Sequence, residues 1–463
     1  MENLTLKQIA KAVNGTLKGD PNLIIGGIST NSKEAAEDIL FVPIKGERFD
    51  AHDFIGDFVQ NGGQAVLTHK AFKCCNEPEN YIKVTDTRLA LGDLARNYRE
   101  QFALPLVGVT GSVGKTSTRL MLANVLQTAG EVCSTQGNFN NDIGMPLTLL
   151  NIEHNHKFAV IEMGMNHFGE IAYLAKTAKP TAAVITNIGT AHIGNLGSKE
   201  GILKAKLEVL EGLQNGGLLV LNGDDDLLFA QKGTLPFKTV FYGINNPDCD
   251  ITATQVIPQP MQSSFKYFCK ATGVTSDVIT INAPGKHHIS NALAAVAVGL
   301  ELGLTEDKIK AGIESFVPGN MRQKIIQTGG VQIIEDCYNA NPDSMLAALQ
   351  VLAAAKAENG GRKIAVLGNM MELGEFTEEG HRLVGDFAVQ HKVDLLVTVG
   401  EHASLIAAQA NSKDVKTVTF GNNQAALEYL AATLHSGDVV LVKASRSSKF
   451  EEISAGLQKH LTN

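Results

Sequence analysis

One short segment constrains the fold of this chain more than any other: an apolar run that enters a glycine turn and continues as a helix. Residues 106–118 read Leu-Val-Gly-Val-Thr-Gly-Ser-Val-Gly-Lys-Thr-Ser-Thr, and the helical pattern extends to Gln127. Glycines let backbone N–H groups approach a phosphate, and the helix N-terminus adds further donors. Lys115 supplies a positive charge, and the Thr116 hydroxyl can ligate Mg²⁺. The segment predicts a phosphate-binding loop for ATP or GTP.

The loop departs from the strict pattern G-x-x-x-x-G-K-[ST] at its first position, which here is Val109. The alternative is a glycine turn with an incidental lysine. The order of strand, loop and helix argues against that alternative. Nucleotide binding is therefore predicted, but the loop alone does not specify the reaction.

The repeated pattern of strand and helix predicts an α/β fold with three domains. A length of 463 residues suggests three, at about 100–200 residues per domain. Apolar strands alternate with helices on both sides of a turn cluster at residues 317–320, which indicates parallel sheets covered on both faces. We predict a small α/β N-terminal domain (1–84), a central P-loop ATPase-like parallel sheet (85–317) and a C-terminal Rossmann-like domain (318–463). The expected strands are 23–28, 39–43, 65–68 and 81–84, then 106–109, 158–163, 182–187, 217–222 and 239–242, then 331–335, 363–367, 395–399, 417–420 and 439–442.

Composition indicates a soluble protein of a reducing compartment. The net charge of −8 argues against a nucleic-acid scaffold. The six cysteines contain no CxxC pair and predict neither a zinc site nor a disulfide framework. The first residues lack the apolar core of a signal peptide, and no apolar run reaches the roughly 18 residues of a membrane span. We expect a cytoplasmic monomer.

Three polar clusters follow the phosphate loop, each at the end of an expected strand, where open α/β sheets place their ligands. The first is a loop over residues 136–146 with three asparagines: Asn138, Asn140 and Asn141. The second is Glu162, whose carboxylate could hold Mg²⁺ directly or through water. The third ends in Asn187 and His192. Each could be a turn, a solvated strand end or a surface histidine, but together they favour a metal–nucleotide site.

The order of these motifs resembles the Mur ligases, ATP-dependent amide-forming enzymes of peptidoglycan synthesis. The motifs TGSxGKT, GNxNNxxGxP, ExG, TNIGxAH and KAK follow one another between residues 110 and 206. Residues 334–342, Ile-Glu-Asp-Cys-Tyr-Asn-Ala-Asn-Pro, resemble the motif of the family member that adds D-alanyl-D-alanine. Residues 40–54, 368–375 and 443–447 agree with it. The resemblance covers essentially the whole chain and is least distinctive in the N-terminal domain.

The resemblance implies a ligase that adds D-Ala-D-Ala to UDP-N-acetylmuramoyl-tripeptide through an acyl phosphate, with ATP and Mg²⁺ as cofactors. The 1–84 domain would bind the UDP-substrate and the 318–463 domain the incoming dipeptide. The alternatives are a folylpolyglutamate synthase, a Mur ligase that adds diaminopimelate or lysine, and a non-catalytic P-loop switch. The motif at 334–342 argues against the other ligases, and a switch needs no third domain with polar motifs.

The resemblance also implies roles for individual residues. The catalytic residues would be Lys115, on the transferring phosphate, and Lys206, His192 and Asp336. The nucleotide would be bound by Gly111, Ser112, Val113, Gly114, Lys115, Thr116 and Ser117, with Asn291 near the adenine and Arg322 near the ribose or phosphates. Magnesium would be held by Thr116, Glu162, His192 and Lys206. Substrate contacts would come from Asn138, Asn140 and Asn141, from Tyr338, Asn339 and Asn341 on the dipeptide side, and from Ser29, Asn31, Ser32, Lys45 and Gly46 on the UDP-sugar side. For these last five, a turn or surface role is the alternative.

Lys206 has two readings. In the helical stretch 203–210, Leu203, Leu207 and Leu210 mark an apolar face, and Lys206 lies at its edge. Periodicity alone favours a snorkelling lysine with its ammonium in water. The resemblance instead implies an N-carboxylated lysine, whose carbamate could bind a second Mg²⁺ as an ammonium could not.

Overall fold

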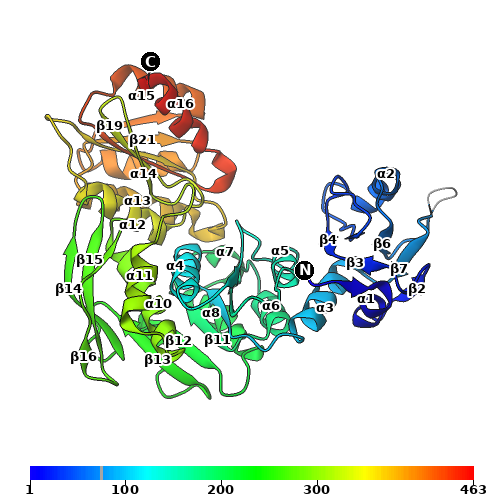
Figure 1. Ribbon diagram of the computed structural model, residues 1–463. Coiled ribbons are helices and arrows are strands. Elements are labelled where there is room, and N and C mark those ends of the chain that lie inside the picture. The colour runs from blue at the N-terminus through cyan, green and yellow to red at the C-terminus, as the bar shows by residue number, and fades with distance from the viewer. Residues whose placement is uncertain (73–76, 463) are drawn as a thin grey trace. The chain divides into compact units, whose positions relative to one another are not determined.

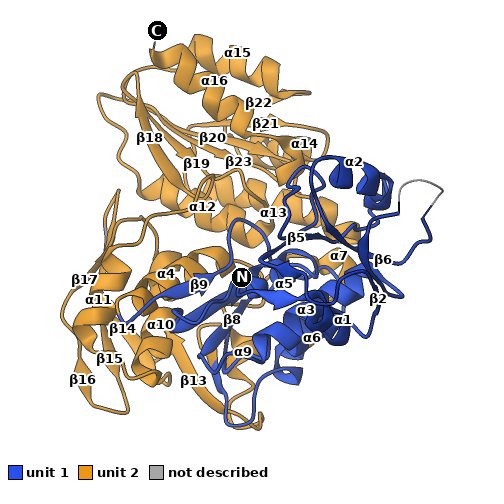
Figure 2. Cartoon of the chain, turned by 45° about the vertical axis from the view of Figure 1, so that its right-hand side comes forward, with its two compact units in different colours: residues 1–110, 129–184, 207–219 blue, residues 111–128, 185–206, 220–463 orange. Residues whose placement is uncertain are grey.

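A computed structural model describes residues 1–72 and 77–462. The chain forms two compact units, each built from several segments (Figure 2). Unit 1 comprises residues 1–110, 129–184 and 207–219, and unit 2 comprises 111–128, 185–206 and 220–463. Strands and helices alternate along the chain, as predicted (Figure 1). The expected domain borders at 84/85 and 317/318 differ from the edges of these units and stay a prediction.

The N-terminal part of unit 1 is a small sheet in the order β2-β7-β6-β5-β4. Its strands are Thr16–Lys18, Asn80–Lys83, Ala65–Thr68, Ile39–Phe41 and Gly27–Ser29. The expected strand 23–28 is interrupted, because Gly26 donates its N–H to the carbonyl of Asp38, 2.8 Å away, between β3 (Ile24–Ile25) and β4. β3 pairs instead with β1 (Leu4–Thr5). The helical elements here are α1 (Leu6–Ala12), η1 (Ala51–Phe54), α2 (Ile55–Gln60) and α3 (Thr87–Arg99).

The rest of unit 1 carries the strand that leads to the phosphate loop. β8 (Leu106–Thr110) is buried along its whole length and pairs in parallel with β10 (Phe158–Glu162). On the far side of β10 lies β9 (Val132–Ser134), and β11 (Ala182–Ile185) is the neighbour of β8. A strand buried on both faces has no polar alternation, which is why β8 is a continuous apolar run in the sequence. The other helical elements are α5 (Gly144–Leu150), α6 (Glu170–Ala178) and η2 (Glu208–Glu211).

Unit 2 begins with the helix that follows the phosphate loop, α4 (Lys115–Gln127), which has the predicted bounds. It packs against α10 (Lys286–Glu301) and α11 (Glu306–Glu314). Strands follow in the order β16-β15-β14-β13-β12. Their bounds are Val274–Thr275, Ser263–Cys269, Ile251–Pro258, Lys238–Gly243 and Leu218–Asn222, and β17 (Ile279–Ile281) pairs with β15. The short helices here are α7 (Ile193–Leu196), α8 (Lys199–Leu207) and α9 (Asp226–Phe229).

Strands β14 to β17 were not predicted. They form antiparallel pairs, and β14 carries Thr252, Thr254 and Gln255, so no continuous apolar run marks it in the sequence. Antiparallel strands can leave one face to solvent, which removes the signal on which the prediction relied.

The C-terminal sheet of unit 2 has the order β18-β19-β23-β20-β21-β22. Its strands are Lys324–Thr328, Val331–Glu335, Val439–Lys443, Lys363–Gly368, Leu395–Val399 and Thr417–Phe420. All five expected strands are present and pair in parallel, and the unpredicted β18 is an antiparallel edge strand. The helical elements are α12 (Pro342–Ala354), η3 (Gly374–Phe376), α13 (Thr377–Gln390), α14 (Ala403–Asn411), α15 (Asn423–Thr433), η4 (Arg446–Ser448) and α16 (Glu451–Thr462).

The described cysteines form no disulfides, and the described helices include no membrane span. Cys133, Cys249, Cys269 and Cys337 are buried free thiols, while Cys74 and Cys75 lie outside the described residues. Over residues 1–72 and 77–462, no helix combines the length and apolarity that crossing a membrane requires.

Asp438 is a buried carboxylate at the start of the C-terminal sheet core. Its side chain is 1% exposed, and Oδ2 lies 2.6 Å from Nη2 of Arg362. The backbone N–H groups of Arg362 and His435 also donate to it, at 2.7 and 3.0 Å. Burial acts to raise the pKa of Asp438, but these hydrogen bonds outweigh burial, and the pKa lies below its ordinary value.

We predict that Asp438→Ala lowers the thermal unfolding midpoint by about 5–10 °C, because a half-buried guanidinium loses its carboxylate partner and two N–H groups lose their acceptor. The stabilisation by the native carboxylate should be present above the unfolded pKa of about 3.9. It should be lost as the pH falls through the lower folded pKa. Scanning calorimetry across pH measures both effects. Asp386→Ala, which removes a more exposed carboxylate on α13, serves as the control and should shift the midpoint little. Equal shifts for the two variants would contradict the prediction.

Candidate active site

The phosphate loop runs from Gly111 to Gly114, between β8 and α4. Gly111 has φ 148° and Gly114 has φ 84°, in the region that favours glycine. A Cβ atom on Gly111 would lie 1.8 Å from Oγ1 of Thr186, and one on Gly114 would lie 2.7 Å from Oδ1 of Asn291. Both glycines are therefore required by backbone conformation and by close neighbours.

Lys115 is the first residue of α4, and its side chain folds back over the loop. Its Nζ donates to the carbonyl oxygens of Gly111 and Ser112, at 2.8 and 3.4 Å. The loop carbonyls thus hold the ammonium close to the N-terminus of α4. A phosphate at this position would meet both the ammonium and the first N–H groups of the helix.

Asn187 braces the phosphate loop from the neighbouring strand end. Its backbone carbonyl accepts the N–H of Ser112 at 3.1 Å. Its side chain accepts the N–H of Val113 at 2.9 Å and donates to the carbonyl of Val113 at 3.0 Å. The sequence singled out Asn187 only as a polar strand end. The structure gives it a definite role in fixing the shape of the loop.

Glu162 ends β10 in unit 1 with a carboxylate that is almost completely buried, at 2% exposure. Asn140 donates its Nδ2–H to Oε1 of Glu162 at 2.8 Å, so the structure brings the first two polar clusters together. Asn141 instead accepts the N–H of Gly144, the first residue of α5, at 2.8 Å, and Asn138 is exposed. Asn140 is thus hydrogen-bonded to the predicted metal ligand.

His192 pairs with a carboxylate from the C-terminal half of unit 2. It has φ 61° and precedes α7, and its Nδ1 lies 2.7 Å from Oε2 of Glu372. The two atoms lie at ion-pair distance, but the contact does not have the geometry of a hydrogen bond. Glu372 belongs to the predicted motif at 368–375 but was not predicted as a site residue.

Lys206 is buried, with only 1% of its surface exposed. The predicted helix face is wrong: the buried residues of α8 are Ile202, Ala205 and Lys206, whereas Leu203 and Leu207 are half-buried. The snorkelling interpretation is also wrong, because the amine does not reach water. Burial, together with the positive charge of Lys115, holds the pKa of Lys206 well below its usual range.

Two predicted nucleotide residues lie outside the loop: Asn291 and Arg322. Asn291 lies beside the loop, whereas Arg322 lies on the ring of a residue predicted to bind the dipeptide. Asn291 of α10 accepts the Thr118 hydroxyl at 3.1 Å and lies against Gly114. Arg322 stacks its guanidinium 3.9 Å from the ring centroid of Tyr338, a predicted dipeptide residue. Its neighbours Met321 and Gln323 both have positive φ, 57° and 56°.

The motif at 336–342 is organised around a buried lysine. Lys443, only 2% exposed, lies 2.9 Å from Oδ2 of Asp336 and donates to the carbonyl of Asn339 at 2.9 Å. Asn341 caps α12, accepting the N–H of Ser344 at 2.8 Å. Lys443 begins the predicted stretch 443–447 but was not itself predicted as a site residue.

The five predicted UDP-sugar residues form two turns in unit 1. Ser29 donates to Oε2 of Glu34 at 2.7 Å and accepts the N–H of Asn31 at 3.0 Å. Ser32 is half-buried, and Lys45 and Gly46 are exposed. Their contacts define turn geometry, and their predicted role in substrate binding stays a prediction.

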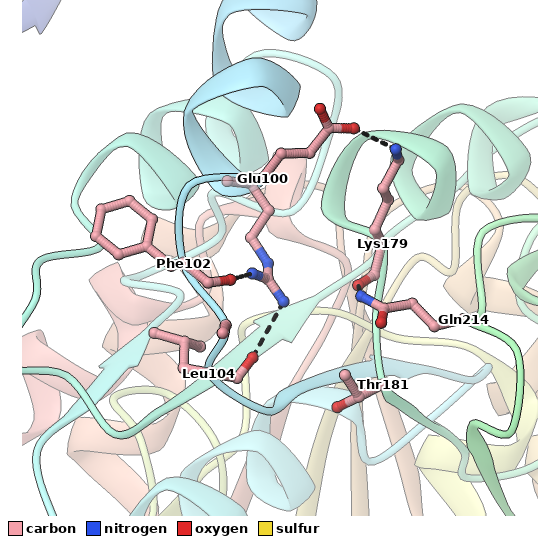
Figure 3. A pocket seen from close by; sticks show the side chains of 8 residues that line it. Glu100, Phe102, Leu104, Lys179, Thr181 and Gln214 are labelled. Atoms are coloured by element: carbon pink, nitrogen blue, oxygen red, sulfur yellow. Dashed lines mark hydrogen bonds and ion pairs between the residues drawn. The ribbon is translucent and has the colours of Figure 1, made fainter.

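A hollow of about 290 Å³ lies in unit 1, and residues Phe102, Leu104 and Gln214 are among those that line it (Figure 3). Arg99 donates there to the carbonyl oxygens of Phe102 and Leu104, and Lys179 pairs with Glu100. None of the residues predicted for the nucleotide, metal or substrate sites is among those that line this hollow.

The fold and the loop together define a nucleotide-binding α/β protein of the P-loop type. Models of three Mur ligase domains match the chain: the family's catalytic domain at residues 24–99, the middle domain at 109–299 and the glutamate ligase domain at 321–446. The UDP-N-acetylmuramoyl-tripeptide–D-alanyl-D-alanine ligase of Bacillus subtilis (strain 168) is 38% identical over 456 residues, covering 97% of each chain. The chain therefore belongs to the Mur ligase family, as its motifs predicted.

Solved structures of Mur ligases agree with this family assignment. MurF from Acinetobacter baumannii superposes with a TM-score of 0.91 at 33% identity, over 99% of each chain. The MurF ligase from Thermotoga maritima in complex with ADP gives a TM-score of 0.82 at 29% identity, covering 94% of this chain and 97% of the other. The predicted α/β class with three-domain Mur ligase architecture is confirmed.

We predict that Gly111→Ala weakens ADP binding at least about a hundredfold while the protein stays folded. A Cβ atom 1.8 Å from Oγ1 of Thr186 would force the loop to move, and alanine is strained at this φ. Isothermal titration measures the affinity, and circular dichroism checks the fold. Gly421→Ala is the matched control, because a Cβ atom there meets nothing within 4 Å. Wild-type affinity in Gly111→Ala would contradict the assigned loop geometry.

Proposed function

We propose that this chain is an ATP-dependent ligase that joins UDP-N-acetylmuramoyl-tripeptide and D-Ala-D-Ala in peptidoglycan synthesis. The observation that carries the proposal is likeness over 97% of both chains to a ligase named for those substrates. The phosphate loop supports the use of a nucleoside triphosphate, and a relative of this fold was solved with ADP. We place the protein in the cytoplasm as a monomer.

The reaction needs two steps in one site. The terminal carboxylate of the tripeptide attacks the γ-phosphate of ATP, giving an acyl phosphate and ADP. The amine of D-Ala-D-Ala then attacks the acyl carbon, and the tetrahedral intermediate collapses to the amide with release of phosphate and a proton. Phosphoryl transfer depends on positioning and charge neutralisation, so no protein nucleophile is required.

Different residues are assigned to the phosphates, the adenosine and the incoming dipeptide. The N–H groups of residues 111–117 would hold the phosphates, and Lys115 would leave its loop carbonyls to neutralise the transferring group. Asn291 and Arg322 are assigned to the adenosine side. Asp336, Tyr338, Asn339 and Asn341 are assigned to the incoming dipeptide, with the buried Lys443 holding Asp336 in place.

Magnesium fits the residue types present. No cluster of three or more His, Cys, Asp and Glu side chains suited to a metal occurs among the described residues. Mg²⁺ bound with ATP needs only one or two carboxylates besides phosphate and water. Thr116 and the buried Glu162 would supply protein ligands to this ion, and His192 would bind a second one. When bound, the ion would polarise the phosphates and offset their negative charge.

Lys206 is proposed to carry a carboxylate group on its amine. An uncharged amine reacts with CO₂ to form a carbamate and releases one proton. The buried site favours the uncharged form, as the lowered pKa of Lys206 indicates. The carbamate would give a second Mg²⁺ an anionic oxygen ligand and would place a negative charge near Lys115.

An acceptor screen tests the function. ADP release should require both UDP-N-acetylmuramoyl-tripeptide and D-Ala-D-Ala, and free L-amino acids should support it poorly. Robust turnover with glutamate on a pterin substrate would assign the chain to the folate ligases. Preference for diaminopimelate or lysine would assign it to another Mur ligase, and nucleotide binding without acceptor-dependent turnover would indicate a switch.

We predict that Lys206→Ala is nearly inactive and that acetate restores part of its activity by occupying the vacated space. Lys204→Ala is the matched control: Lys204 is exposed on the same helix and should tolerate substitution. Initial rates of ADP release with and without acetate measure the effect. Near-normal turnover of Lys206→Ala in bicarbonate-free buffer would exclude the carbamate.

A further inference from the structure

The segment at residues 187–192, which holds the phosphate loop, also contacts the C-terminal half of unit 2. Gly189 shows this most directly. A Cβ atom on Gly189 would lie 3.2 Å from Cβ of Ser112 and 2.5 Å from Oδ2 of Asp343. The phosphate loop and the first turn of α12 therefore meet at a residue that has no side chain to separate them.

Asp343 makes this contact through two short hydrogen bonds. Its Oδ2 accepts the backbone N–H of Thr190 at 2.6 Å and the hydroxyl of Thr190 at 2.7 Å. One residue earlier, the N–H of Gly189 donates to Oγ of Ser112 at 2.9 Å. Hydrogen bonds to a carboxylate are roughly twice as strong as those between neutral groups. A continuous hydrogen-bonded path thus runs from α12 to the phosphate loop.

A second contact holds the same segment further along. Beyond the pair of His192 with Glu372, Gly194 lies so close to η3 that a Cβ atom would be 2.7 Å from the backbone nitrogen of Gly374. The segment is therefore held by C-terminal residues at two places. Of the two contacts, the one through Asp343 is nearer to the phosphate loop.

We propose that Asp343 is a positioning residue that couples nucleotide binding at the phosphate loop to the placement of the acceptor motif at 336–342. Asp343 directly follows that motif on α12, so a shift of the helix would move Thr190, Gly189 and then Ser112. The coupling is reciprocal: a nucleotide that fixes the loop favours this position of α12, and loss of the contact weakens nucleotide binding. The identity of the acceptor rests on the proposed function, whereas the coupling rests on the contacts.

The test uses the full chain with Asp343→Ala, Asp343→Asn, Thr190→Val and the control Asp386→Ala. ADP affinity is measured by titration without other substrates, and the KM for ATP and for D-Ala-D-Ala by ADP release. Asp343→Ala should weaken ADP binding about five- to fiftyfold and raise the KM for ATP similarly. Asp343→Asn keeps an acceptor oxygen and should recover most of that affinity. Thr190→Val should weaken binding less, and Asp386→Ala should leave it unchanged.

Two results would overturn the proposal. Wild-type ADP affinity in both Asp343→Ala and Thr190→Val would show that the contact does not affect nucleotide binding at the loop. If Asp343→Ala fails to fold, wild-type affinity in Thr190→Val alone would overturn the proposal. Equal losses in Asp343→Asn and Asp343→Ala would assign the effect to the lost charge at the start of α12. A different result would contradict the proposed function: the wild-type chain would bind ADP but show no dipeptide-dependent turnover.

Discussion

The hydrogen bonds between Asn187 and the phosphate loop are the interaction on which the rest of the site depends. A glycine-rich loop has many accessible conformations, so its N–H groups converge on a phosphate only if other groups fix the backbone. Asn187 fixes Ser112 and Val113 through three hydrogen bonds. Because Gly189 and Thr190 follow directly, the segment that shapes the loop also carries its contacts to α12.

Two buried lysines of unit 2 show how surroundings decide the chemistry of one residue type. Lys443 lies 2.9 Å from the carboxylate of Asp336 and forms a buried ion pair with it. For Lys206, burial and the charge of Lys115 disfavour the ammonium. A neutral amine is the form that can react with CO₂, so the environment that excludes a simple surface lysine also suits the proposed modification.

The sequence predicted an element correctly where its pattern was local or where the strand is buried on both faces. The apolar run of β8, the loop and α4 were readable because each follows from backbone conformation and burial alone. The prediction failed for β14 to β17, whose strands lack continuous apolar runs, and for α8. On α8, Leu203 and Leu207 suggested the buried face, but they are only half-buried, and the buried residues are Ile202, Ala205 and Lys206.

The sequence by itself determined the nucleotide loop, the α/β class and the family, because glycine positions, strand–helix alternation and motif order are properties of the chain. The tertiary structure alone decided which polar side chains act together. Asn140 meets Glu162, Lys443 meets Asp336, and Asp343 meets Thr190 across 153 positions of sequence. Such pairs have no local signature, since the two partners are separated along the chain and only folding brings them within hydrogen-bonding distance.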